Sequence, residues 1–311
     1  MIVSVIVSVI VLAATMKNNI KLGRICIPLG IKCNLSCEYC YRDICRKEIP
    51  RKATNKFLSY LKSLDTSTYA VIFSGGEPLL YIDTIRKITG ILPKHIHKKV
   101  MTNGLLLTEE LVDYFNNNDF EVHISHDGKH TKELRGQDVF KNKLQLIKKI
   151  RYLRIVSVIS NQNTNVMKVY QYIQNKLNRP FYFEASPIIP TGENDNLITG
   201  FNYDRFEKTL AEVLRIRNKS PFEWYHNKPS GMGLNVLLDG SIVGMGTLNK
   251  YGTVWDTEET IRNNFLAKEQ KGIAYCQQSI CSIKPCSMNK SLACQHMCRI
   301  NRIRHDINDE V

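Results

Sequence analysis

Three closely spaced cysteines are the residues of this chain with the clearest chemical potential. Cys33, Cys37 and Cys40 are separated by three and two residues, and an apolar run of isoleucines and a leucine precedes them. A closed structural zinc site normally takes four ligands. A cubane iron–sulfur cluster binds thiolates at its corner irons, so three thiolates would leave the fourth iron open to an outside ligand. We therefore expect these cysteines to hold an open, reactive cluster.

Two other interpretations of the thiols stay open on the spacing alone. Cys26 or Cys45 lies close enough in sequence to complete a four-ligand zinc site. A disulfide between two of the three central cysteines would leave one thiol over and would require an oxidising compartment.

The ten cysteines of the chain fall into two groups of five. The late group consists of Cys276, Cys281, Cys286, Cys294 and Cys298. Clustering near both ends, with no cysteine between Cys45 and Cys276, indicates metal or cluster ligation rather than scattered disulfides. Because free thiols persist in a reducing cytosol, we expect a cytoplasmic protein.

Composition sets limits on size and on partners. A chain of 311 residues can form one large core with a smaller appendage, or two modest domains. The 43 Lys and Arg residues exceed the 29 Asp and Glu residues, and the net charge is +14. That balance favours acidic partners, nucleic acid among them. The basic residues are scattered along the chain, so nucleic-acid binding is kept as an alternative.

The first fifteen residues, Met1 to Thr15, are apolar and carry no charge. They lack the positive segment that begins a secretory signal. The run is also short for a membrane span of about 20 residues. Met16 offers a second plausible start, so we expect residues 1–15 to be a dispensable extension and the protein to have no stable membrane association.

Strand and helix patterns alternate between residues 21 and 185. Strands are expected over 21–27, 69–73, 98–101, 120–125, 153–159 and 181–185, with a helical pattern in each connection. This alternation is typical of parallel βαβ units. Six units make an open sheet or an incomplete barrel rather than a full eight-fold one.

Unusual peptides follow several of these strands. The cysteine loop follows the first strand, Ser74-Gly75-Gly76-Glu77-Pro78 the second, Thr102-Asn103-Gly104 the third, and Ser125-His126-Asp127-Gly128 the fourth. Functional groups of parallel α/β folds gather at the carboxyl ends of strands. The sequence therefore predicts one site at this edge of the sheet.

The regular alternation of strand and helix patterns ends near Pro190. A polar linker is followed by a helix over 203–215 and by a hairpin whose strands, 234–238 and 241–243, flank an Asp-Gly turn. The final stretch has too few apolar residues to pack without a metal. We expect an extension (1–15), a core (16–190) and a small Cys-rich C-terminal region (191–311).

The cysteine loop ending in Tyr39-Cys40, together with Gly-Gly-Glu-Pro after the second strand, resembles the radical S-adenosylmethionine (radical SAM) superfamily. The resemblance covers about residues 21–185. It implies an α/β fold with a partial (β/α)6 TIM-like barrel around a [4Fe–4S] cluster, whose open iron binds S-adenosylmethionine. It also implies reductive cleavage to methionine and a 5′-deoxyadenosyl radical, with electrons from a flavodoxin or ferredoxin. Cys26 and Cys45 then become bystanders.

The same resemblance implies which residues contact the cofactor. Gly75 and Gly76 can bring loop carbonyls close to an ammonium group because they lack side chains, and Glu77 adds a negative charge. An ordinary strand-to-helix turn is the alternative. The further implied contacts are Tyr39 on the adenine side, Arg135 with the methionyl carboxylate, Ser125 and Asn103.

Ordinary turn chemistry is the alternative for Ser125 and Asn103, and a surface position is the alternative for Arg135. His126 occupies the variable position of Ser-x-Asp-Gly, where it could pack locally or face substrate. The sequence does not decide between these two roles.

The late cysteines resemble the auxiliary-cluster region of the SPASM/twitch group, which modifies peptides and proteins. They would hold one auxiliary [4Fe–4S] cluster, or a zinc ion, with one thiol to spare. Met245 stands where fuller members have a cysteine, so a second auxiliary cluster is not expected. Gly246 replaces the aspartate base of sulfatase-maturing relatives, which counts against that particular activity. His296 is expected at the surface or behind the ligands.

The leading functional hypothesis is therefore a radical SAM enzyme that abstracts hydrogen from a peptide or protein side chain. An RNA-modifying radical SAM enzyme is the alternative that the net charge of +14 suggests. A non-catalytic, metal-stabilised binding protein is the alternative of another class.

Overall fold

The computed structural model describes residues 22–40, 50, 52–189, 193–221, 234–244, 250–264, 267, 296, 299–300 and 303. The predictions for residues 1–15, Cys45, Met245, Gly246 and the five late cysteines lie outside these residues. No helix within the described part of the chain combines the length and apolar character that crossing a membrane requires.

Six parallel strands form the centre of the fold and confirm the predicted α/β architecture. They are β1 (Arg24–Pro28), β2 (Ala70–Ser74), β3 (His97–Thr102), β4 (Phe120–Ser125), β5 (Tyr152–Ile159) and β6 (Tyr182–Pro187). Each strand pairs in parallel with the next, so their order in the sheet follows the chain. The strands form a curved, unclosed sheet, as an incomplete barrel requires.

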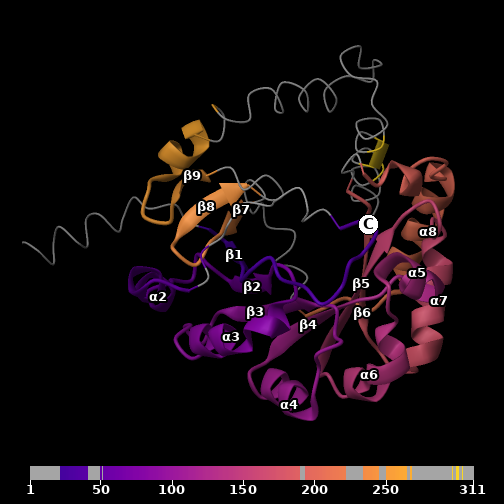
Figure 1. Ribbon diagram of the computed structural model, residues 1–311, viewed down its shortest axis with the longest axis horizontal. Helices are drawn as coiled ribbons and strands as arrows, with labels where there is room; N and C mark the ends of the chain where they lie inside the picture. Colours follow the sequence, from indigo (N-terminus) through magenta and orange to yellow (C-terminus); the bar gives the residue numbers. More distant parts are fainter. Residues whose placement is uncertain are drawn as a thin grey trace, which may run out of the picture.

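Helices connect the strands and cover the convex side of the sheet (Figure 1). They are α2 (Asn55–Lys62), α3 (Ile82–Thr89), α4 (Glu109–Asn117), α5 (Thr131–Arg135), α6 (Val139–Lys148), α7 (Val166–Leu177) and α8 (Tyr203–Ile216). Short 3-10 helices precede α3, α5 and α8: η2 (Pro78–Tyr81), η3 (Gly128–His130) and η4 (Asp195–Leu197). α8 was predicted from the sequence, whereas α5 and the 3-10 helices were not.

Local sequence explains where the main helices begin. Thr54, Thr108, Asp138, Asn165 and Asn202 each accept a hydrogen bond from a backbone N–H of the first helical turn. Such side chains satisfy donors that have no partner within the helix. Apolar residues of the helices then bury one face against the sheet, and the two together form one large core.

The predicted hairpin is present, but it does not stand apart from the central sheet. β7 (Leu234–Val236) and β8 (Ser241–Gly244) are antiparallel, and Gly240 has the positive φ of +84° that their turn requires. β7 pairs in parallel with β1, opposite Cys26, while β9 (Lys250–Thr253) adds to β8. The result is a nine-stranded sheet in the order β6-β5-β4-β3-β2-β1-β7-β8-β9.

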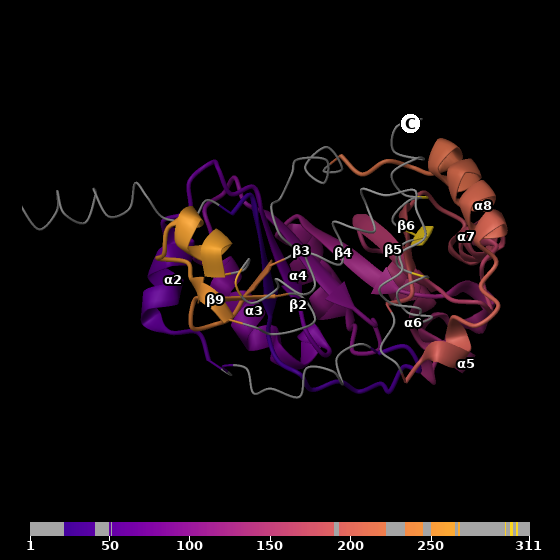
Figure 2. The same cartoon turned by 90° about the horizontal axis from the view of Figure 1, so that it is seen from above.

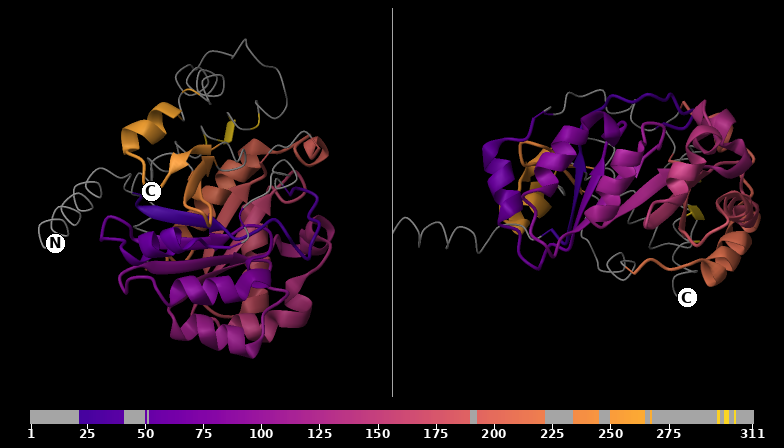
Figure 3. Two further views of the ribbon diagram at one scale, coloured as in Figure 1. Left: turned by 60° about the vertical axis from the view of Figure 1, so that its left-hand side comes forward. Right: turned by 90° about the horizontal axis from the view of Figure 1, so that it is seen from below.

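Views from other directions show the extent of this sheet. β9 and α2 lie at one end, and α7 and α8 lie at the other (Figure 2). The hairpin continues beside β1 (Figure 3). Contacts reinforce the first end, because the ring of Trp255 lies 4.0 Å from the Lys56 ammonium and 6.4 Å from the ring of Tyr60. The sheet therefore runs across the boundary between the expected core and C-terminal region.

A buried charged cluster occupies the concave face of the sheet, opposite the helices. Glu121 accepts hydrogen bonds from His123 Nε2 at 2.6 Å and from Arg154 Nε at 2.7 Å. Ser220 Oγ donates to the same carboxylate at 2.6 Å, and Lys99 Nζ lies 3.7 Å away. All five residues are at most 5% exposed. The neighbouring strand positions point the other way, into the apolar core.

Burial also shifts the pKa values of Lys99 and Glu121 in this cluster and of His97, on which their charges act. Burial lowers the pKa of His97 to about 3, and the charge of Lys99 acts in the same direction. Burial lowers the pKa of Lys99 to about 8. Burial raises the pKa of Glu121, but the hydrogen bond from His123 and the charges of Arg154 and Lys99 outweigh it, and the net direction is down.

These shifts predict that acid destabilises the protein well before all carboxylates are protonated. Because folding lowers the pKa of His97, its contribution is fully present above the unfolded value of about 6.5 and is lost as the pH falls toward the folded value. We expect the free energy of unfolding, measured by urea titration under reducing conditions, to decrease between about pH 7 and pH 4. In His97→Asn, the free energy of unfolding should change less steeply with pH over this range.

The exposed His95 provides the matched control, since its Nε2 bonds the carbonyl of Asp65 at the surface. His95→Asn should leave the pH dependence unchanged. Equal slopes for the wild-type protein and His97→Asn would contradict the role given to the buried imidazole.

Candidate functional site

The carboxyl ends of β1 to β4 lie at one edge of the sheet because these strands are parallel and adjacent. The cysteine loop follows β1, and the Gly-Gly-Glu-Pro segment follows β2. Asn103 follows β3, and the turn containing Asp127 follows β4. The predicted gathering of these segments at one edge is therefore present.

Backbone hydrogen bonds extend the β1–β2 pairing into the cysteine loop. Gly76 N–H donates to Gly30 O at 2.7 Å, and Glu77 N–H donates to Lys32 O at 2.8 Å. A Cβ atom at Gly76 would lie 1.9 Å from Lys32 O. Gly75 has a φ of +122°, and its Cβ would lie 2.6 Å from Gly30 O. Both glycines are therefore required for the loop to approach this closely, a reason that the sequence alone did not show.

Glu77 connects the ends of two strands. Its buried carboxylate accepts hydrogen bonds from Leu79 N at 3.0 Å, Thr102 Oγ1 at 2.6 Å and Asn103 N at 2.9 Å. Asn103 Nδ2 in turn donates to Asn34 Oδ1 at 2.7 Å, inside the cysteine loop. Glu77 and Asn103 thus hold the first half of the loop against β3, and their contacts with a cofactor stay predictions.

The three thiols of the loop are free and partly exposed. Burial raises the pKa of Cys37, the charge of Arg135 lowers it, and the thiols of Cys40 and Cys33 raise it. The described residues contain no group of three His, Cys, Asp or Glu side chains suited to one metal ion. A cubane cluster makes a different demand, because each thiolate binds a separate iron.

Cys26 has a different environment from the loop cysteines. It lies within β1 and shares a hydrogen bond of 3.2 Å with Ser74 Oγ. Burial raises the pKa of its thiol. A strand position with a protein partner fits the expectation that Cys26 is a bystander.

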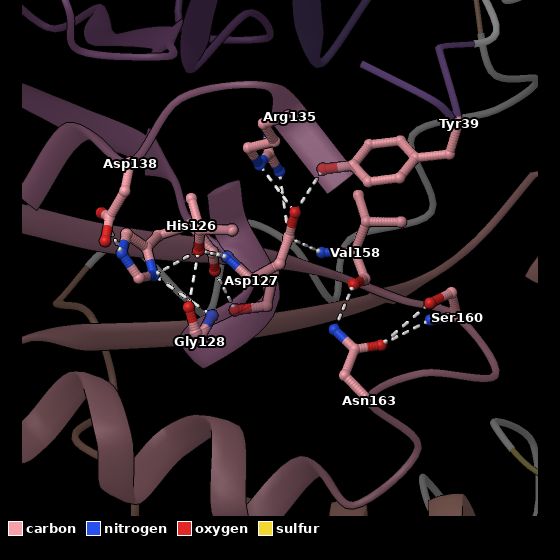
Figure 4. A network of polar contacts seen from close by, with 11 residues as sticks. Tyr39, His126, Asp127, Gly128, Arg135, Asp138, Val158, Ser160 and Asn163 are labelled. Carbon is pink, nitrogen blue, oxygen red and sulfur yellow. Dashed lines mark hydrogen bonds and ion pairs between the residues drawn. The ribbon is translucent and has the colours of Figure 1, made fainter. Parts of the chain in front are cut away.

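Asp127 is the centre of a buried polar network beside the loop (Figure 4). Tyr39 OH donates to Asp127 Oδ2 at 2.5 Å. Arg135 donates through Nε at 2.7 Å and through Nη2 at 3.1 Å, and Val158 N–H donates at 2.8 Å. The Arg135 guanidinium also lies 5.2 Å from the centre of the Tyr39 ring. Two residues assigned to the cofactor from sequence, Tyr39 and Arg135, are thereby brought together.

His126 packs inside the turn that carries Asp127. Its ring stacks on Phe140 at 3.8 Å, Nδ1 accepts from Gly128 N–H at 3.1 Å, and Nε2 bonds Asp138 Oδ1 at 3.1 Å. The side chain is fully buried. Of the two roles left open by the sequence, the structure shows local packing. Ser125, the preceding residue, is partly exposed at the end of β4.

A cavity of about 380 Å³ lies next to the loop. Its lining consists of Cys33, Asn34, Leu35, Ser36, Arg135, Gly136 and Gln137. A loop thiol, that of Cys33, and the cationic side chain of Arg135 therefore line the same cavity. Burial and the contact with Asp127 raise the pKa of the Tyr39 hydroxyl, which donates to that carboxylate.

His296 is buried, which rules out the surface position, one of the two positions expected from the sequence. It is fully buried, and Nε2 bonds Ile188 O at 3.2 Å. Because a carbonyl can only accept, Nδ1 is left to accept from Tyr203 OH at 2.9 Å. Burial lowers the pKa of His296, which favours this neutral form. With both ring nitrogens bonded to protein, His296 is not available as a metal ligand.

The fold and the site together define an α/β protein of the partial-barrel class with an open, three-thiol site at the carboxyl edge of its sheet. The profile of the Radical SAM superfamily matches residues 27–168. This match and the relatives described next support a radical SAM enzyme that is similar to the anaerobic sulfatase-maturating enzymes.

Two curated relatives illustrate this similarity. The cysteine-type anaerobic sulfatase-maturating enzyme of Clostridium novyi is 29% identical over 179 residues, which are 48% of this chain and 47% of the relative. The serine-type enzyme of Bacteroides thetaiotaomicron is 32% identical over 116 residues, 32% of this chain and 28% of the relative. The chain thus spans about half, or less, of the length of these relatives.

Solved structures show the same fold over most of the chain. One is a histidine-tagged form of anSMEcpe with bound AdoMet, with a TM-score of 0.63 and 20% identity, covering 92% of this chain and 99% of that chain. Another is native anSMEcpe with bound AdoMet and the Kp18Cys peptide, with a TM-score of 0.62, 20% identity and coverage of 92% and 99%.

Two residues of the site were not predicted from the sequence. Asp127 was visible within Ser-x-Asp-Gly, but it received no role, and two of its donors, Tyr39 and Val158, lie 88 and 31 residues away. Asn34 lies between the first two loop cysteines and gave no signal of its own, since its partner Asn103 is 69 residues away.

The close approach at Gly76 predicts a specific cost for a side chain there. In Gly76→Ala the new Cβ would collide with Lys32 O, so the loop must move or the strand must shift. We expect a loss of about 1–3 kcal/mol in the free energy of unfolding, as for overpacking in a core. Urea unfolding measures it, and alkylation of the three loop thiols should also become faster.

Gly90→Ala is the matched control. Its Cβ would meet nothing closer than Arg86 O at 3.5 Å, an ordinary contact, and we expect it to be neutral or slightly stabilising. A Gly76→Ala protein as stable as Gly90→Ala would show that the loop does not need this approach.

Proposed function

We propose that this protein is a radical SAM enzyme that cleaves S-adenosylmethionine reductively and abstracts hydrogen from a side chain of a peptide or protein. The observation that carries the proposal is the position of three free thiols on one loop, held against the Gly75–Glu77 segment at the carboxyl edge of the sheet. When bound there, a [4Fe–4S] cluster with S-adenosylmethionine would supply one electron to the sulfonium and so a 5′-deoxyadenosyl radical.

The residues of the loop and its neighbours have distinct parts in this proposal. Cys33, Cys37 and Cys40 bind three irons and leave the fourth for S-adenosylmethionine. Gly75 and Gly76 keep the loop close, and Glu77 orients both strand ends. The cofactor's ammonium group binds at the Gly75–Glu77 segment, which carries the required carbonyls and negative charge.

Arg135 is proposed to bind the carboxylate of S-adenosylmethionine. It lines the cavity beside Cys33, and its Nε and Nη2 donate to Asp127. The remaining Nη1 donors can then bind a carboxylate, the partner that a guanidinium recognises best. Tyr39, Ser125 and Asn103 complete the proposed contacts with the cofactor.

Similarity to known proteins supports the proposed substrate class. Two matched relatives are named as sulfatase-maturating enzymes, and one solved neighbour holds a peptide. We propose a peptide or protein substrate, a flavodoxin or ferredoxin as the electron donor, and a reducing cytoplasmic setting. The five late cysteines are proposed to hold one auxiliary [4Fe–4S] cluster or a zinc ion.

Anaerobic reconstitution tests the reaction directly. The full chain is loaded with iron and sulfide, reduced with dithionite and supplied with S-adenosylmethionine, and 5′-deoxyadenosine is quantified. Cys37→Ala should abolish its formation, because two thiolates hold a cubane poorly. Cys26→Ala, which changes a strand thiol outside the loop, should retain it. A fully loaded wild-type protein that forms no 5′-deoxyadenosine would refute the proposal.

Mass spectrometry of the same reaction tests the substrate class. Short peptides containing cysteine or serine are expected to lose hydrogen in a manner that depends on S-adenosylmethionine. Modification of RNA, with none of the peptides changed, would instead favour the nucleic-acid alternative.

A further inference from the structure

We propose that Asp127 is a positioning residue that couples the cysteine loop to Arg135. All of its acceptor capacity is used by groups from three separate parts of the fold. Oδ2 accepts from Tyr39 OH and Arg135 Nε, and Oδ1 accepts from Arg135 Nη2 and Val158 N–H. Since Asp127 is fully buried, its carboxylate depends on these protein donors rather than on bulk solvent.

The chemistry of the position requires a carboxylate. Every one of the four contacts is a donor to Asp127, and two of them come from a buried guanidinium. An asparagine would keep one acceptor oxygen and turn an N–H group toward the other donors. It would also leave the Arg135 charge without its buried counter-charge, which is costly.

The second half of the cysteine loop depends on this carboxylate. Tyr39 lies between Cys37 and Cys40, and its ring packs in a small apolar cluster with Leu134, Ile188, Leu197 and Ile198. Glu38 N–H also donates to Leu134 O at 3.0 Å, one residue before Arg135. The loop and the end of α5 are therefore attached to each other twice, once through backbone and once through Asp127.

A consequence is energetic coupling between the loop and any anion bound at Arg135. If Asp127 holds both, ordering one favours the ordered state of the other, and the effect is reciprocal. The inference rests on the proposed function only where the anion is S-adenosylmethionine. The attachment of the loop to Asp127 is a property of the chain itself.

Thiol alkylation of the full-length, cluster-free protein tests the attachment. Rates for individual cysteines are measured by mass spectrometry after iodoacetamide treatment. In Asp127→Asn we expect Cys37 and Cys40 to react about tenfold faster, because loss of a charge-assisted hydrogen bond favours local opening. Cys26, within β1, should react at its wild-type rate.

Two further variants make this result specific. Asp138→Asn alters a carboxylate that bonds His126 and begins α6 but does not touch the loop, and the loop thiols should react as in the wild-type protein. Tyr39→Phe removes only the hydroxyl and should raise both rates by a smaller factor. In the Asp127→Asn background it should add nothing, since its partner is already gone.

The spectroscopic arm tests the coupling in the reconstituted protein. Titration with S-adenosylmethionine is followed by its effect on the EPR spectrum of the reduced cluster. In Asp127→Asn, the midpoint of this titration should move to an about tenfold higher concentration of S-adenosylmethionine. The comparison requires that Asp127→Asn and Asp138→Asn have equal iron content and equal Tm. An unchanged midpoint at equal iron content would overturn the coupling.

The two arms also separate this inference from the proposed function. A wild-type protein that does not respond to S-adenosylmethionine contradicts the proposed function, while the alkylation arm still decides the role of Asp127. Wild-type alkylation rates in both Asp127→Asn and Tyr39→Phe would overturn the inference. If Asp127→Asn does not fold, Tyr39→Phe alone decides it.

Discussion

The buried carboxylate of Asp127 joins the loop that carries the thiols to the sheet that positions them. It can do so because β4 and β5 are parallel neighbours, so the turn after β4 reaches Val158 of β5 on one side and Tyr39 on the other. Glu77 has a similar positioning role on the opposite side of the loop, where its carboxylate connects the ends of β2 and β3. Both carboxylates are fully buried: Asp127 binds the loop directly through Tyr39, and Glu77 supports it through Asn103, which bonds Asn34. A loop without its own secondary structure becomes ordered through these contacts.

Buried charge is distributed over two places with different consequences. At the strand ends, Asp127 pairs with Arg135 beside a cavity, where a ligand can share the guanidinium. On the concave face, Glu121 pairs with Arg154, and Ser220 closes over the pair. Isolated buried ion pairs contribute little net stability because desolvation offsets their attraction. The apolar core between sheet and helices supplies the stability that allows both clusters to persist.

The described residues of the C-terminal region pack against the barrel and extend its sheet. β7 continues the sheet beside β1, and Thr54 N–H, at the start of α2, donates to Leu238 O. Farther along the chain, His296 bonds Tyr203 and Ile188, close to the end of β6. The hairpin and the barrel therefore share one sheet and one apolar core.

Local pattern determined much of the outcome, because a strand or helix is set largely by the spacing of its own apolar residues. The strand over 120–125, the hairpin around Gly240 and the grouping of motifs at strand ends were all predictable from sequence. So were the three loop cysteines, whose spacing is itself the chemical signal. Contacts between distant segments were not predictable. The partners of Asp127 include Tyr39, 88 residues away, and those of His296 include Ile188, 108 residues away. A single sequence carries no record of which side chains meet, so burial of His296, the β1–β7 pairing and the Asp127 network were decided only by the tertiary structure.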